Sequence, residues 1–257
     1  NVTGNFNTAV GTEALYNNNA SDNTAVGRRA LYSNTSGTNN TAVGRNTLAT
    51  NTTGSYNTAV GRESLLANTT GETNTAIGYE AANALTAATD NIAIGYNALK
   101  GASNTGSHNN IAIGSAALGA LGATDGCDGN VAIGKDALSA VDGNENNNVA
   151  IGANAMTSVN ANNSANNVII GSGAGTGGAA TFASNIAIGE GAMDATGGIA
   201  AAENVFIGKD SGNGTWTTAA SDGNVAVGFN TMQGAMNGVT GSVAIGKSAL
   251  NALTTGS

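Results

Sequence analysis

The chain has 257 residues, of which only 4% are aromatic and 9% are charged, against a usual charged share of roughly 25%. It contains 39 glycines and no proline, and its formal net charge is −8. This composition disfavours a conventional globular core. The 8 lysines and arginines look scattered along the sequence, which argues against nucleic-acid binding. No run of 18 apolar residues occurs, so no segment is expected to insert into a membrane.

A five-residue motif organises the whole chain. It reads Asn-Thr-Ala-Val-Gly at Asn23–Gly27 and again at Asn40–Gly44, and its last copy is Ser242–Gly246. There are fourteen copies, and successive motif glycines are 16 to 20 residues apart. A short unit repeated head to tail predicts an all-β fold, a parallel β-solenoid or β-roll of about fourteen coils. We expect residues 1–257 to form a single β-roll repeat domain.

Each copy predicts a short strand in the three residues before its glycine. The residue directly before glycine is always Val or Ile, and the residue three before is Thr up to Thr75 and Ile or Val from Ile92 onward. Side chains alternate across a strand, so these two positions share one face, and β-branched residues suit it. We expect this face to point into the solenoid. The small Ala between them is expected to point the other way, where a neighbouring chain packs closely.

The flanking positions recur as well. Asn stands four residues before the glycine in thirteen copies, and we expect stacked Asn side chains to hydrogen-bond from coil to coil. The glycine is expected to turn the chain with backbone angles that a Cβ would forbid. Leu or Met stands four residues after it in eleven copies, with breaks at Ala82, Gly175 and Gly212. We expect this segment to form a return strand whose Leu packs beneath the Val and Ile residues.

The remainder of each unit varies in length and is rich in turn-forming Asn, Gly, Ser, Thr and Asp. These loops are expected to leave one side of the solenoid, and the longer loops of later copies are where specific recognition is expected. The few large apolar side chains of one coil fall short of the entropy lost in ordering it. A second apolar surface is therefore needed. The stripe of Ala predicts one, and with it a homo-oligomer, most simply a homotrimer.

Three copies, Ser242–Gly246, Asn130–Gly134 and Asn148–Gly152, resemble the head repeat of trimeric autotransporter adhesins. The longer pattern of Asn23–Leu31, Asn-Thr-Ala-Val-Gly-x-x-Ala-Leu, is similar to repeats in phage tail fibres. The adhesin resemblance implies a left-handed parallel β-roll, three chains wide, that binds host surfaces or matrix proteins. The unit of 16 to 20 residues is longer than that of the adhesin heads.

Residues that could carry chemistry are few and isolated. His108 and Cys127 are the only histidine and cysteine, so the sequence predicts no catalytic triad, no His-based metal site and no intrachain disulfide. Both are expected to be loop side chains. The candidate ligand contacts are the aromatic residues Trp216, Phe182, Tyr79 and Tyr96. Tyr79 and Tyr96 each follow a motif glycine and could form a short aromatic ladder.

Calcium is the one cofactor that the loops could hold. Carboxylates on neighbouring coils could gather Ca²⁺, although isolated Asp-Gly turns explain them equally well. The carboxylates concerned are Asp125, Asp128, Asp142, Asp194 and Asp222.

These observations predict a structural and adhesive fibre segment of a phage tail fibre or bacterial surface adhesin. It would be extracellular, part of a longer fibre or a processed subunit, and would attach to a cell-surface glycan or protein receptor. The alternative is a self-assembling extracellular filament subunit. An ice-binding solenoid would need an outward array of Thr, whereas the Thr column ends at Thr75 and fits an inward face better. No enzymatic activity is expected, because the strand positions hold Ala, Val and Ile rather than clustered Asp, Lys or Arg.

Overall fold

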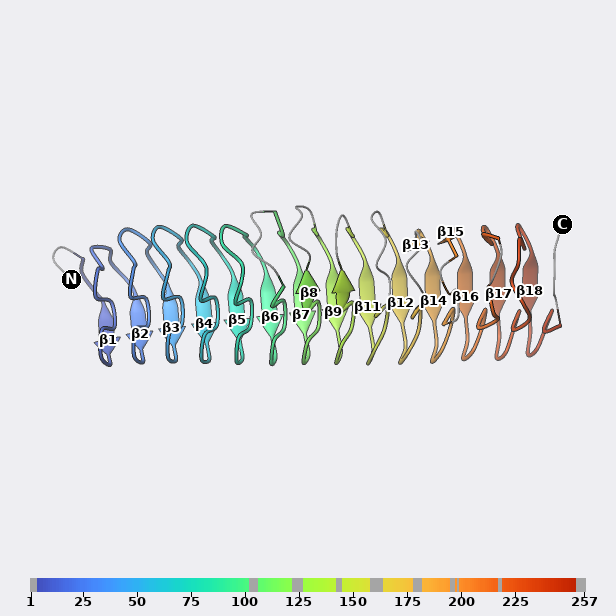
Figure 1. The fold of residues 1–257 in the computed structure, drawn as a ribbon, viewed down its shortest axis with the longest axis horizontal. Coiled ribbons are helices and arrows are strands. Elements are labelled where there is room, and N and C mark those ends of the chain that lie inside the picture. Colours follow the sequence, from blue (N-terminus) through green and yellow to red (C-terminus); the bar gives the residue numbers. More distant parts are fainter. Residues whose placement is uncertain are drawn as a thin grey trace. The chain divides into compact units, whose positions relative to one another are not determined.

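The computed structural model describes residues 4–101, 106–121, 127–141, 145–157, 164–177, 182–194, 197, 199–216 and 219–252. Within these ranges every regular element is a β-strand and there is no helix, so the predicted all-β parallel solenoid is confirmed. The chain divides into two compact units, Asn1–Asp128 (unit 1) and Gly129–Ser257 (unit 2). In each unit, successive copies of the motif lie side by side (Figure 1).

Unit 1 is built on seven three-residue strands, and consecutive strands from β1 to β7 pair in parallel. They are β1 (Thr8–Val10), β2 (Thr24–Val26), β3 (Thr41–Val43), β4 (Thr58–Val60), β5 (Thr75–Ile77), β6 (Ile92–Ile94) and β7 (Ile111–Ile113). The two-residue β8 (Ala120–Leu121) follows. Equivalent residues lie opposite one another, as Ala25 does opposite Ala42. The solenoid is therefore in register with its sequence repeat.

Unit 2 repeats the arrangement with seven further three-residue strands. They are β9 (Val131–Ile133), β11 (Val149–Ile151), β12 (Val168–Ile170), β14 (Ile186–Ile188), β16 (Val205–Ile207), β17 (Val225–Val227) and β18 (Val243–Ile245). Three two-residue strands lie between them: β10 (Ala140–Val141), β13 (Phe182–Ala183) and β15 (Ala201–Ala202). β13 pairs in parallel with β15.

The motif glycine turns the chain, as expected. Gly27 has φ of 133°, and a Cβ on it would lie 2.4 Å from the carbonyl oxygen of Gly44 on the next coil. Both the backbone conformation and the close approach of successive coils therefore require glycine.

The predicted Asn ladder is confirmed in both units. Asn40 is fully buried, and its backbone N–H donates to Oδ1 of Asn23 at 3.0 Å. Its own Nδ2 donates to the carbonyl of Gly54 at 2.9 Å. In unit 2 the same contact joins the N–H of Asn167 to Oδ1 of Asn148 at 3.1 Å. Each Asn side chain thus satisfies backbone groups that would otherwise be buried without a partner.

The faces of the strands are the reverse of the expectation. In the three-residue strands from β2 onward the central residue, Ala in most of them, is the buried one: Ala25, Ala42 and Ala59 are 0% exposed. The flanking Val, Ile and Thr side chains point outward, and Val43 and Ile77 are 36% and 39% exposed. The prediction of a dry interior of Val and Ile, with Ala facing a neighbouring chain, was therefore wrong. In a coil this short, Ala is the residue that fits between the strand and a Leu in the turn opposite it, and the two larger residues at this position, Ile169 and Phe206, each lie against a glycine.

The buried Ala packs in one core with the Leu four residues after the glycine, and the exceptions show this. Where that Leu is replaced by Gly175, the Ala position holds Ile169, and a Cβ on Gly175 would lie 3.0 Å from Ile169 Cγ2. Where it is replaced by Gly212, the Ala position holds Phe206, at 2.7 Å from such a Cβ. In these two coils the larger side chain on the strand therefore takes space that Leu or Met fills beside Ala in most other coils.

The segment after the glycine is a turn and not the predicted return strand. Arg29 and Leu31 have φ of 58° and 50°, and equivalent residues in other copies have similar values. This left-handed conformation is unfavourable for Leu. Hydrogen bonds between coils hold it in place: Leu31 N donates to Thr47 O at 3.0 Å, and Arg29 N donates to Thr12 O at 2.9 Å.

Candidate functional site: two outward-facing surfaces

The described ranges contain no pocket and no group of three or more His, Cys, Asp or Glu residues that could hold a metal ion. Of the calcium candidates, Asp125 and Asp142 lie outside these ranges. In the same part of the chain, no helix has the length and hydropathy needed to cross a bilayer. The features that could act on a partner are therefore surfaces.

The first surface, here called the outward face, consists of the side chains one and three residues before each motif glycine. On β2 to β5 it pairs Thr with Val or Ile, as in Thr58 with Val60. On β6, β7 and the three-residue strands of unit 2 both positions are Val or Ile, as in Ile186 with Ile188. Each of these side chains is half-buried or exposed. Each unit thus presents a ribbon of β-branched side chains that its own chain does not cover.

The outward direction also changes the reading of the Thr column. Thr24, Thr41, Thr58 and Thr75 stand in register on the outside of β2 to β5, and not inside as expected. The predicted inward orientation of the Thr side chains was therefore wrong, and it no longer argues against an ice-binding array. The array is short, however, because Ile92 takes the Thr position on β6.

The second surface, here called the Arg–Tyr column, consists of the residues that directly follow five successive motif glycines. They are Arg28, Arg45, Arg62, Tyr79 and Tyr96, and all five are exposed. Backbone hydrogen bonds fix the column: the N–H of Asn46 donates to Arg28 O at 2.9 Å, and the N–H of Glu63 donates to Arg45 O at 3.0 Å. Adjacent members are one coil apart, about 4.8 Å.

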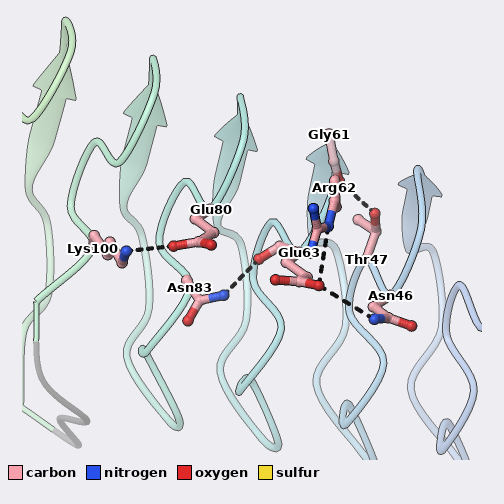
Figure 2. Close-up of polar contacts among 8 residues, drawn as sticks. All are labelled: Asn46, Thr47, Gly61, Arg62, Glu63, Glu80, Asn83 and Lys100. Atoms are coloured by element: carbon pink, nitrogen blue, oxygen red, sulfur yellow. Dashed lines mark hydrogen bonds and ion pairs between the residues drawn. The ribbon is translucent and has the colours of Figure 1, made fainter.

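The acidic residues beside this column are already paired. Arg62 Nε donates to Glu63 Oε1 at 3.2 Å, and Asn46 Nδ2 donates to the same oxygen at 3.4 Å (Figure 2). Glu13 pairs with Arg29 at 3.2 Å, where the Arg29 guanidinium also lies 4.3 Å from the ring centre of Tyr32.

Arg28 and Arg45 form no ion pair within the described ranges. Because the nearby glutamates have their own partners, the column carries an uncompensated positive charge at these two residues.

The two tyrosines stack as the sequence predicted. The ring centres of Tyr79 and Tyr96 are 5.4 Å apart, and the ring planes are inclined by 10°. The guanidinium of Arg62 lies 5.4 Å from the Tyr79 ring centre, on a neighbouring coil. Ser115 follows the next motif glycine after Tyr96 and is too small to cover a ring. The 57% exposure of Tyr96 reflects this open side.

Glu80 joins the tyrosine stack to Lys100. The Glu80 carboxylate accepts a hydrogen bond from Lys100 Nζ (Figure 2). This bond, followed by one from the Tyr79 hydroxyl, lowers the pKa of Glu80. The same contacts raise the pKa values of Tyr79 and Lys100. All three groups thus keep their neutral-pH charge states, and the pair beside the stack is electrically neutral.

The other predicted residues lie in the core or between coils. Trp216 and Phe182 are each 2% exposed, and the Trp216 ring packs edge-on against Phe206 at 6.4 Å. Their rings are therefore not available to a ligand in this structure, whereas those of Tyr79 and Tyr96 are. Cys127 lies in a loop, as expected, and its side chain is buried there. His108 Nδ1 accepts a hydrogen bond from the N–H of Thr89 at 3.0 Å.

The tyrosines of the Arg–Tyr column were predicted from the sequence, but its arginines were not, because the basic residues look scattered along the chain. Aligning the copies by their glycines would have placed Arg28, Arg45 and Arg62 at one position of consecutive units. The longer loops of the later copies, where recognition was expected, include residues 102–105, 122–126, 142–144, 158–163 and 178–181, outside the described ranges.

No protein-family model matches this chain, and no curated protein is similar to it in sequence.

Proposed function

We propose that this chain is a structural and adhesive fibre segment that assembles as a homotrimer through its outward face and attaches to a cell surface. An extracellular position, on a virion tail fibre or a bacterial surface, belongs to the same proposal. The observation that carries it is the uncovered ribbon of Val and Ile on the strands of both units. The resemblance of the motif to adhesin heads and tail-fibre repeats points the same way.

A second copy of the chain is the partner that this ribbon fits best. The outward side chains repeat once per coil, so a partner with the same period can match them over many coils, whereas a partner without a repeat cannot. Most oligomers of identical chains close by rotational symmetry, so every subunit contributes the same residues to the contacts. The earlier assignment of the contact to the Ala stripe is replaced, because Ala150 and its equivalents are buried within their own coil.

A structural rather than catalytic role agrees with the surfaces. The strand positions carry aliphatic side chains and Thr, and the ion pairs of the described ranges are exposed, such as that of Lys209 with Glu190, at 3.1 Å. Such exposed pairs contribute little energy. A stiff repeat that presents several copies of one surface gains avidity when its subunits bind together. This is the physical basis of the proposed attachment.

The trimer is tested by light scattering on the purified chain, with a mass three times 24.8 kDa as the expected result. Replacing Ile151 and Ile170 together by Lys should reduce the mass to that of one chain, because charged groups cannot be buried unpaired in the contact. The matched control places Lys at Ala153 and Ser172, two residues further along the same coils and exposed.

Three outcomes would contradict the proposed assembly. A wild-type monomer overturns the trimer, and a trimer that survives both Ile substitutions overturns the outward face as its interface. Polymers of increasing mass would instead favour a self-assembling filament subunit. Circular dichroism on both double variants checks that the β-solenoid is retained.

A further inference from the structure

We propose that the Arg–Tyr column binds an anionic polysaccharide, with Arg28 and Arg45 contacting its charged groups and Tyr96 stacking on a sugar ring. The inference rests on the proposed attachment function and deepens it by naming the class of receptor and the residues that bind it. It is carried by three features of one column: unpaired charge, regular spacing and an open aromatic face.

The charge of this column is positive at Arg28 and Arg45, opposite in sign to the net charge of the whole chain. The chain has a formal net charge of −8, yet Arg28 and Arg45 lie on adjacent coils with no acidic partner in the described ranges. The nearby carboxylates of Glu13 and Glu63 are engaged by Arg29 and by Arg62. Arginine binds carboxylate, sulfate and phosphate groups through a planar fork of N–H donors. The column therefore favours a partner with repeated anionic groups.

The backbone holds these two guanidiniums in a fixed order. The amide after each column residue donates to the carbonyl of the column residue one coil earlier, from Asn46 N to Arg28 O and onward to Ala116 N to Tyr96 O, both at 2.9 Å. The column thus rises by about 4.8 Å per residue along its length. An extended polymer lying along it meets a cation at consecutive steps, and then reaches the tyrosines.

The tyrosine end gives the column its preference for sugar. One face of the Tyr96 ring is covered by Tyr79, and the other borders the coil of Ser115, so a ring can stack there. The C–H face of a sugar ring packs well on an aromatic ring while its hydroxyls stay in water. A nucleic acid also carries charge and stacks, but the column itself offers only two arginines without an ion pair in the described ranges, and the chain is acidic, so electrostatic binding of a nucleic acid would be weak.

Binding of fluorescent dextran sulfate to the full chain, measured by anisotropy at several salt concentrations, tests the inference. We expect binding to dextran sulfate and none to uncharged dextran of equal length. Replacing Arg28 and Arg45 together by Gln should weaken binding about tenfold and make it less dependent on salt. The matched control replaces Lys135 and Lys209 by Gln, which removes equal charge from the corresponding positions of unit 2.

The control pair should change the affinity by less than about twofold, since its lysines are not on consecutive coils. Tyr96→Ala should weaken binding about threefold and Tyr96→Phe should not, because the ring and not the hydroxyl makes the contact. Equal losses in the two charge pairs would overturn the column as a site. Tighter binding of an oligothymidylate, lost in the Arg28 and Arg45 variant, would overturn the polysaccharide as its partner.

Attachment of the labelled wild type and the Arg28 and Arg45 variant to bacterial cells separates this inference from the function it rests on. Equal attachment of both proteins overturns the column while the fibre function stands. If neither attaches to any cell surface, yet dextran sulfate still binds only through the column, the adhesive function is overturned and the binding site stands. Weaker attachment of the variant supports both.

Discussion

At the scale of single residues, the interior of each coil is a matched pair of positions. Phe206 fills the place that Ala holds in neighbouring coils, and Gly212 leaves the room that Leu would take. Neither substitution is tolerable alone in a close-packed interior, and each makes the other possible. The packing of this coil therefore depends on the pair and not on either side chain.

A double-mutant cycle at Phe206 and Gly212 makes this testable. Phe206→Ala should destabilise the fold by about 3–5 kcal/mol through the cavity it leaves. Gly212→Leu should cost at least about 1–3 kcal/mol through collision with the Phe206 ring. The double variant restores the Ala and Leu of other coils and should recover most of both losses, because Leu adopts the same left-handed conformation elsewhere.

Urea unfolding of the four proteins, followed by circular dichroism, measures the coupling. Additive losses in the double variant would show that the two positions do not share one volume. The Ile169 and Gly175 pair offers an independent second cycle.

At the scale of the structural element, the Asn column replaces much of the bonding that a longer strand would supply. Asn57 is fully buried, and its Nδ2 donates to Gly71 O at 2.8 Å. Its Oδ1 accepts from the N–H of Asn74 at 3.0 Å and from Asn74 Nδ2 at 3.1 Å. One side chain thus ties its own strand both to the loop and to the strand of the next coil.

Asn57→Ala should therefore destabilise the protein by on the order of 3 kcal/mol, since buried N–H and C=O groups lose their partners. Asn17→Ala, at an exposed residue, is the control and should change stability by less than about 0.5 kcal/mol. The midpoint of thermal unfolding is measured for the wild type and for each variant, and Asn57→Ala should lower it more than Asn17→Ala does. Equal losses of stability in the two variants would mean that the Asn column does not stabilise the stacking of the coils.

The same elements show what sequence could and could not predict. Invariant glycines, the Asn column and the strand before each glycine follow from the repeat alone, because each position has one physical requirement. Alternation shows that Val26 and Thr24 share a face but not which face is inside. The hydrophobicity of Val and Ile favoured an inward orientation for this face, but the coil is so narrow that these side chains point outward. The informative signal was the exchange of Ala and Leu for Ile169 with Gly175, which places these two positions in one core.

The Arg–Tyr column could have been predicted from the sequence, whereas the burial of the other aromatic candidates could not. Alignment by glycine places Arg28 to Tyr96 at one position, whereas nothing in the local sequence distinguishes the exposed Tyr96 from the buried Trp216. Trp216 is buried and its ring packs against Phe206, which lies on β16 earlier in the same repeat unit. Such a contact depends on the coil geometry, which the repeat does not specify.

At the scale of the whole molecule, stability is expected to grow coil by coil. Within each unit the strands pair only with those of the neighbouring copies, as β12 does with β11 and β14. A linear stack of this kind has a free energy that is close to a sum of coil and neighbour contributions. Removing coils from one end should therefore lower the free energy of unfolding gradually, with each coil that is lost.

Two fragments of unit 2 test this, residues 129–257 with seven of the three-residue strands and residues 164–257 without β9 and β11. We expect both to retain the β-sheet signal in circular dichroism, with a lower unfolding midpoint for the shorter one because it has fewer contacts between coils. The comparison is made at equal chain concentration, since the stability of an oligomer depends on it. Complete loss of structure in the shorter fragment alone would show that the unit folds as one indivisible body, and the additive description of the stack would then be wrong.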